Sequence, residues 1–122
     1  MRALATHPAA RGLEDDAAVL EVGSETLVLT HDTIVSGTHF LPFQDMADVA
    51  WKLVAANLSD LAAKGAEPVG ILLSHTLSSD DTRFVEGLAE VLDAYACPLL
   101  GGDTVSGAEQ RIYGATAIGR AT

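Results

Sequence analysis

The sequence predicts an α+β fold in which two helices cover one face of a mixed β-sheet. Three observations support this prediction. The run from Thr26 to Ile34 is rich in β-branched residues, which favour strands. The runs that follow Asp45 and Asp81 space their apolar residues three and four apart, as amphipathic helices do. Short strand-like runs lie before, between and after these helices, so the predicted order is β-β-α-β-α-β-β.

The composition is that of one globular domain. The chain has 122 residues, of which 48% are hydrophobic and 20% charged, which is enough for one core and too little for two. Its formal net charge of −10 argues against binding nucleic acid or an anionic membrane through a basic face. No apolar run reaches the about 20 residues of a membrane span, and no signal peptide is apparent. The single cysteine, Cys97, excludes an intrachain disulfide and predicts a reducing, cytoplasmic location.

The first predicted strand follows a run of acids. Residues 1–12 show no usable period, so we expect a flexible lead-in there. Glu14-Asp15-Asp16 then precedes a short apolar run, Ala17 to Leu20. Three successive acids can form a solvated turn, or they can bind Mg²⁺, which prefers carboxylate oxygens and keeps several waters. The residues alone leave both interpretations open.

Asp32 lies near the end of the β-branched run. Alternation along a strand places Thr30 and Asp32 on one face and His31 on the other. A carboxylate disfavours a strand, so Asp32 is expected to have a partner. Strand ends of α/β folds often carry groups that contact ligands. In the loop that follows, His39 can donate a hydrogen bond to phosphate or can pack as an ordinary loop histidine.

The first helix carries a third candidate carboxylate, Asp60. Asp45 or Asp48 can cap the start of this helix, and Lys64-Gly65 is a stop signal. Aspartate suits a helix interior poorly, because its side chain competes for backbone hydrogen bonds. Asp60 therefore belongs either to a solvated face or to a site for hard cations. The expected buried face holds Val49, Leu53, Ala56 and Leu61.

The second half of the chain is predicted to form a strand, a helix and two more strands. The ranges are a strand over 69–77, a helix capped within 78–81, a brief buried strand over 98–100 and an alternating strand over 111–118. Nothing remaining in the chain can cover the second face of such a sheet. A symmetric partner is the expected cover.

The segment Gly101-Gly102-Asp103-Thr104 follows the brief strand. Two glycines let a backbone approach a ligand closely, and their amides can face phosphate oxygens. A hairpin turn explains the glycine pair equally well. Asp103 is the fourth candidate carboxylate, and convergence with Asp16, Asp32 and Asp60 would make a metal site.

Four segments together resemble the N-terminal domain of the thiamine-monophosphate kinase family, in the superfamily of aminoimidazole ribonucleotide synthetase. They are Asp15–Leu20, Asp32-Thr33 with Gly37–Pro42, Asn57–Pro68, and Gly101–Thr104. They occur in the family's order and spacing and span residues 12 to 120. The resemblance implies an ATP- and Mg²⁺-binding domain over 13–122 whose sheet pairs with that of a second copy in a homodimer.

The resemblance also implies ATP-dependent phosphorylation of thiamine monophosphate to thiamine diphosphate. The implied Mg²⁺ ligands are Asp16, Thr30, His31, Asp32, Asp60 and Asp103, the implied nucleotide contacts are Gly102, Asp103 and Tyr95, and the implied substrate contact is His39. No covalent catalytic residue is implied, because in-line phosphoryl transfer needs positioning and charge neutralisation.

Two positions depart from the family. His31 replaces a small hydroxyl residue, and Glu14 replaces a glycine. The family's second domain does not follow in these 122 residues, so we expect them to be half of a longer kinase and inactive alone. Two alternatives are another ATP-dependent synthetase of the superfamily and a non-catalytic dimerisation module.

Overall fold

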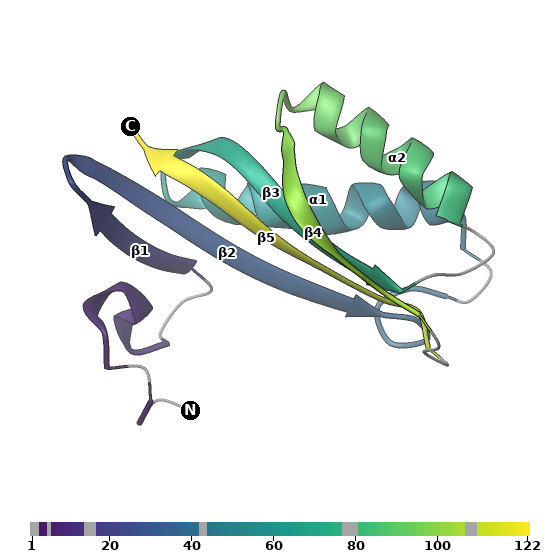
Figure 1. Cartoon of the computed structure of the whole chain (residues 1–122), viewed down its shortest axis with the longest axis horizontal. Coiled ribbons are helices and arrows are strands. Elements are labelled where there is room, and N and C mark those ends of the chain that lie inside the picture. The colour runs from purple at the N-terminus through teal and green to yellow at the C-terminus, as the bar shows by residue number, and fades with distance from the viewer. Residues whose placement is uncertain (1–2, 5, 14–16, 42–43, 77–80, 107–109) are drawn as a thin grey trace.

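The computed structural model describes residues 3–4, 6–13, 17–41, 44–76, 81–106 and 110–122 (Figure 1). Its elements are a 3-10 helix η1 (Pro8–Leu13), β1 (Ala17–Val22), β2 (Glu25–Val35), α1 (Met46–Ala63), β3 (Ala66–Thr76), α2 (Asp81–Ala94), β4 (Leu99–Val105) and β5 (Ile112–Ala121). From β1 onward this is the predicted order. The predicted cap of the second helix at 78–80 lies outside the described residues.

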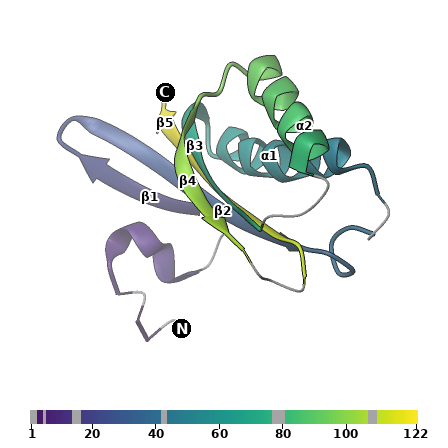
Figure 2. The same cartoon turned by 45° about the vertical axis from the view of Figure 1, so that its right-hand side comes forward.

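The five strands form one mixed sheet in the order β1-β2-β5-β3-β4. All neighbours are antiparallel except β3 and β4, which are parallel and are joined through α2. Both α-helices lie on the same face of the sheet, as the views in Figures 1 and 2 agree. The predicted fold class is therefore confirmed. No helix in the described ranges is long and apolar enough to cross a membrane.

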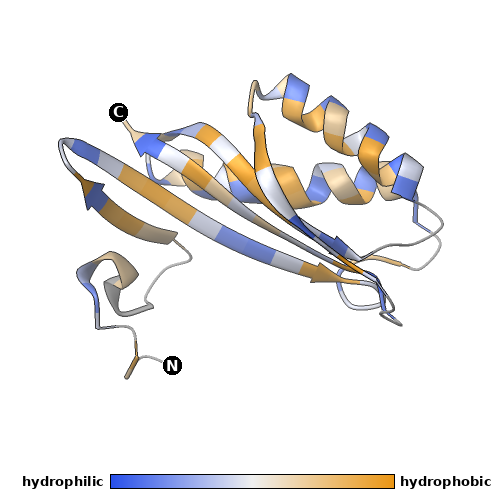
Figure 3. Ribbon diagram, in the orientation of Figure 1, coloured by the Kyte–Doolittle hydropathy of each residue, from blue (hydrophilic) through white to orange (hydrophobic). Residues whose placement is uncertain are grey.

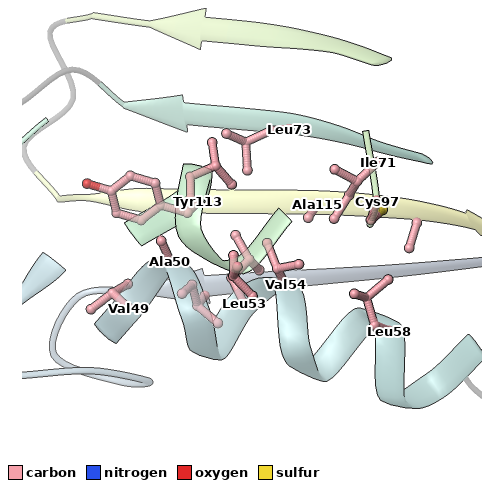
Figure 4. Packing of buried hydrophobic residues seen from close by; sticks show 14 of the residues in the cluster. Val49, Ala50, Leu53, Val54, Leu58, Ile71, Leu73, Cys97, Tyr113 and Ala115 are labelled. Carbon is pink, nitrogen blue, oxygen red and sulfur yellow. The ribbon is translucent and has the colours of Figure 1, made fainter. Parts of the chain in front are cut away.

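The core lies between this face of the sheet and α1. Figure 4 shows Leu53 and Val54 of α1 directed toward Ile71 and Tyr113 of the sheet, and all four are fully buried. Phe84 brings α2 into the same core, where its ring stacks on Tyr113 at 4.3 Å between centroids. Each such side chain contributes about 1.5–3 kcal/mol through burial. The polar segment that interrupts apolar β2 is visible in Figure 3.

Both ends of α1 follow their sequence signals. Asp45 is the N-cap and accepts a hydrogen bond from the backbone N–H of Ala47 at 3.1 Å. Arg83 of α2 also donates to Asp45, with Nη2 at 2.7 Å and Nε at 3.2 Å, so the cap joins the two helices. The hydrogen bond from Arg83 lowers the pKa of this carboxyl most, and that from Ala47 lowers it further. The helix ends at Lys64-Gly65, where Gly65 has φ +68°.

Two predictions about burial are wrong. Leu99 and Leu100, expected in a buried strand, are 48% and 50% exposed, because β4 is an edge strand with a neighbour on one side only. Ala56 is exposed, because the buried stripe of α1 is centred on Leu53, Val54 and Asn57. In the lead-in, where no regular element is expected, the structure has η1.

The sheet face away from α1 and α2 mixes apolar and polar side chains. Strand pairing places Leu29 of β2 beside Ile118 of β5, and Leu72 of β3 beside Thr116. Leu29 and Ile118 are half-buried, whereas Leu72 is 41% exposed. We call this surface the open face. Its apolar part is the region for which the sequence predicts a partner.

Candidate functional site

Asp32 carries a buried carboxylate oxygen that has no hydrogen-bond partner within the described ranges. The residue is half-buried on β2, opposite Ala115 of β5, and the oxygen concerned is Oδ2. A carboxylate withdrawn from water is costly unless a donor or a cation meets it. Mg²⁺ supplies such a partner, since it takes carboxylate oxygens as ligands. The position therefore fits a metal ligand.

Thr30 lies two residues before Asp32, on the same face, and is 2% exposed. Its hydroxyl donates to Oδ1 of Asn57 on α1 at 3.1 Å. The Asn57 amide nitrogen donates in turn to the carbonyl oxygen of Leu53 at 3.0 Å. This chain of hydrogen bonds ties β2 to the middle of α1. The Thr30 hydroxyl thus has a structural role as a hydrogen-bond donor, in addition to the metal contact that the sequence predicts for it.

His31 lies on the open face, as strand alternation predicts. Its Nδ1 is 2.7 Å from the hydroxyl oxygen of Thr116, and its Nε2 is 3.2 Å from that of Thr33. The imidazole therefore bridges two threonines of neighbouring strands. A ring held in this way presents no nitrogen lone pair to an ion unless a threonine hydroxyl turns away. His31 and Asp32 are adjacent in sequence and face opposite ways.

Gly102 and Asp103 are part of strand β4 rather than of a turn. They line a shallow groove on the open face, together with His31, Ser74 and Thr116. Asp103 pairs with Ser74 in the parallel register. A Cβ on Gly102 would lie 1.7 Å from the carbonyl oxygen of Leu73, so packing against β3 already requires glycine there.

His39 lies in the exposed loop between β2 and α1, where its ring Nδ1 accepts the backbone N–H of Val35 at 3.0 Å. Tyr95, just after α2, is 48% exposed and packs edge-on against Trp51 at 6.3 Å. It borders a small, mostly apolar pocket between α1 and the start of β3, with Leu58 and Pro68. This pocket and the groove of the preceding paragraph share no lining residue.

The four predicted carboxylates are not seen to converge. Asp16 lies outside the described residues. The other three are Asp32 on β2, half-buried Asp60 on α1 and exposed Asp103 on β4. Within the part of the chain that the structure describes, no three His, Cys, Asp or Glu side chains come close enough together to hold a metal ion.

Sequence reasoning missed two residues of this region. Asn57 is fully buried and organises the helix face next to β2; an amide inside an apolar helical run is the signal that points to it. Lys52 of α1 donates from Nζ to the carbonyl oxygen of His39. Its signal is that it is the only basic residue in the sequence of this helix.

The fold and these motif positions define a class of protein. A family model, "AIR synthase related protein, N-terminal domain", matches residues 14–121, and the chain belongs to this family. It is similar to the thiamine-monophosphate kinase of Escherichia coli (strain K12), with 42% identity in an alignment 118 residues long that covers 90% of this chain and 36% of that protein.

Two solved structures are also similar to it. One is AaThiL complexed with AMPPCP and TMP, with a TM-score of 0.81 and 30% identity over 91% of this chain and 39% of that one. The other is the thiamine-monophosphate kinase of Stenotrophomonas maltophilia K279a, with a TM-score of 0.73 and 39% identity over 98% of this chain and 39% of that one. The chain thus spans less than half the length of these relatives.

Proposed function

We propose that this chain is the Mg-ATP-binding, dimerising part of a thiamine-monophosphate kinase. The complete enzyme would transfer the γ-phosphoryl group of ATP to thiamine monophosphate and form thiamine diphosphate. The observation that carries the proposal is the 42% identity to the Escherichia coli kinase across 90% of the chain. The cytoplasmic location stays a prediction from the single cysteine.

Asp32 is the first residue of the proposed Mg²⁺ site, because its buried, unpaired oxygen (unpaired among the described residues) fits a cation. The further proposed ligands, of more than one Mg²⁺ ion, are Asp16, Thr30, Asp60, Asp103 and His31, the last through its backbone oxygen because both ring nitrogens contact threonines. When bound, Mg²⁺ neutralises charge on the transferring phosphoryl group. A chain with a net charge of −10 repels ATP at long range, so we expect nucleotide binding to require the metal.

The remaining proposed contacts use groups that the fold leaves accessible. Gly102 and Asp103 would lie against the nucleotide at the open groove. Tyr95 borders the separate apolar pocket, and its proposed nucleotide contact rests on the family resemblance alone. His39 would contact the phosphate of thiamine monophosphate as a hydrogen-bond donor. No side chain of this set acts as a covalent nucleophile. Their work is to hold two anionic ligands in position, which is what phosphoryl transfer needs.

The open face is proposed to pair with that of a second copy. Exposed Leu72 and half-buried Leu29 and Ile118 support this pairing. Sedimentation velocity should find a dimer for the wild-type chain and a monomer for Leu72→Lys. Val85→Lys is the matched control, since Val85 is an exposed apolar residue of α2, and it should stay dimeric. A wild-type monomer, or a dimer of the Leu72 variant, would refute the pairing.

Calorimetric titration with Mg-ATP tests the site itself. We expect heat for the wild-type chain, none for Asp32→Asn, and wild-type heat for Asp48→Asn, which changes an exposed acid. Asn at position 32 should not lower stability in the absence of metal, because it removes a buried charge. A non-catalytic module would give no heat with any variant.

The reaction is tested on the complete gene product. Incubation with ATP and thiamine monophosphate should yield thiamine diphosphate, and purine-pathway precursors should not be turned over. The 122-residue chain alone should show negligible turnover. Turnover of a purine precursor instead would assign the protein to another synthetase of the superfamily.

A further inference from the structure

The loop between β2 and α1 holds His39 from two sides. On one side, the backbone N–H of Val35 donates to the ring Nδ1 at 3.0 Å. On the other, Nζ of Lys52, which projects from α1, donates to the carbonyl oxygen of the same histidine. The ring and the backbone of His39 are therefore each fixed by a different element of the fold.

Other residues in the described part of the loop, up to residue 41, also make backbone hydrogen bonds. Gly37 takes the left-handed conformation, φ +85°, and its N–H donates to the carbonyl oxygen of Phe40 at 2.7 Å. The N–H of His39 donates to the carbonyl oxygen of Val35 at 2.9 Å. Phe40 is 4% exposed, and its ring packs 6.1 Å from that of Tyr113. The loop is thus anchored in the core directly after the histidine.

The contact from Val35 decides where the ring proton lies. A backbone N–H can only donate, so Nδ1 must offer its lone pair. A neutral His39 therefore carries its proton on Nε2. His39 is exposed, so this Nε2–H is available as a donor to a ligand oxygen.

Lys52 secures this arrangement from the helix. Its ammonium group binds the carbonyl oxygen of His39. The helix that carries Lys52, α1, is packed against the core. The ammonium also adds positive charge at the loop in a strongly acidic chain, which favours an anionic ligand there. Lys52 therefore acts on the ligand indirectly, by holding the loop that carries His39, and does not contact the reacting atoms.

We propose that Lys52 is a positioning residue that holds the His39 loop, with the imidazole in its Nε2–H form, ready to donate to a phosphoryl oxygen of the substrate. That this substrate is thiamine monophosphate, a phosphate monoester, rests on the proposed function. The position of the loop and the tautomer do not rest on it. They can be measured on this chain without any ligand.

Long-range ¹H–¹⁵N spectra of the histidine rings at pH 8 test the positioning. In the wild type, the His39 signals, identified by their loss in His39→Asn, should show an unprotonated Nδ1 and a protonated Nε2. In Lys52→Met, a mixture of the two tautomers should average these shifts, and Lys52→Arg should restore them. Lys64→Met removes the same charge from the end of the same helix and should leave them unchanged. Unchanged His39 signals in Lys52→Met would overturn the proposal.

Kinetics of the complete gene product provide the second readout. Lys52→Met should raise KM for thiamine monophosphate by about tenfold and leave KM for ATP unchanged, and Lys52→Arg should recover most of the loss. An equal rise in both KM values would overturn the assignment to this substrate. If the gene product does not phosphorylate thiamine monophosphate, the proposed function fails, and the ring spectra still decide the role of Lys52. Should Lys52→Met not fold, Lys52→Gln replaces it in both experiments.

Discussion

The hydrogen bond between Thr30 and Asn57 allows a quantitative test of how β2 is held to α1. Thr30→Val keeps the side-chain volume and removes the hydroxyl, which leaves Oδ1 of Asn57 without this donor at a fully buried position. A buried polar group that loses its partner costs about 1–3 kcal/mol. We therefore expect the free energy of unfolding to fall by about 2 kcal/mol.

Asn57→Ala should cost more, about 2–4 kcal/mol, because it adds a cavity to the lost hydrogen bonds. The carbonyl oxygen of residue 57 lies 3.5 Å from the Thr30 hydroxyl and offers it a weak second acceptor. In the double variant neither group is left unpaired. Its loss should therefore be smaller than the sum of the two single losses, by about 1 kcal/mol or more.

Urea unfolding followed by circular dichroism measures these energies. All four chains must be compared at one protein concentration, since the stability of a dimer depends on it. Thr33→Val is the matched control, because Thr33 is an exposed threonine of the same strand, and its effect should stay within about 0.5 kcal/mol. The reasoning fails if Thr30→Val costs no more than this control, or if the two single effects add to within about 0.3 kcal/mol.

Three further outcomes follow from individual contacts. Gly102→Ala should lower the urea midpoint strongly, because its Cβ would lie 1.7 Å from a carbonyl oxygen of β3. Gly101→Ala should be nearly neutral, because its Cβ would lie 3.6 Å from its nearest neighbour. Equal effects of the two substitutions would contradict the packing argument. Arg83→Ala should raise the titration midpoint of the Asp45 carboxyl, measured by NMR. Since Arg83 lowers this pKa, the stabilising contact is present above the pKa of an unfolded aspartate and is lost as the pH falls through the lower folded value. An Asp45 titration midpoint that does not move in Arg83→Ala would argue against the ion pair. Burial raises the pKa of the Cys97 thiol, so labelling by a disulfide reagent at pH 8 should be on the order of a hundredfold slower than in the urea-unfolded chain, and equal rates would show that the thiol is accessible.

The ends of α1 could be predicted from the sequence because caps depend on neighbouring residues. Asp45 bonds two residues ahead, and Gly65 supplies the left-handed turn that stops the helix. The opposite orientation of His31 and Asp32 was predictable for the same reason, since strand alternation is local.

The exposure of β4 could not be predicted in this way. Leu99 and Leu100 are apolar, and a short apolar run usually indicates a buried strand. Burial is decided by the position of a strand in the sheet, and β4 lies at its edge. Whether Asp32, Asp60 and Asp103 converge likewise depends on how a strand, a helix and an edge strand are placed in space, which no local pattern specifies.

The central position of β5 has a consequence for how the chain folds. Of the five described strands, β5 is synthesised last, yet it lies between β2 and β3 and pairs with both. The pairing of Leu27 with Arg120 joins residues 93 positions apart and so closes a long loop, which slows folding. Until β5 leaves the ribosome, the inner edges of β2 and β3 remain open to other nascent chains. We therefore expect the risk of aggregation to be greatest during synthesis and to end when this one strand is inserted.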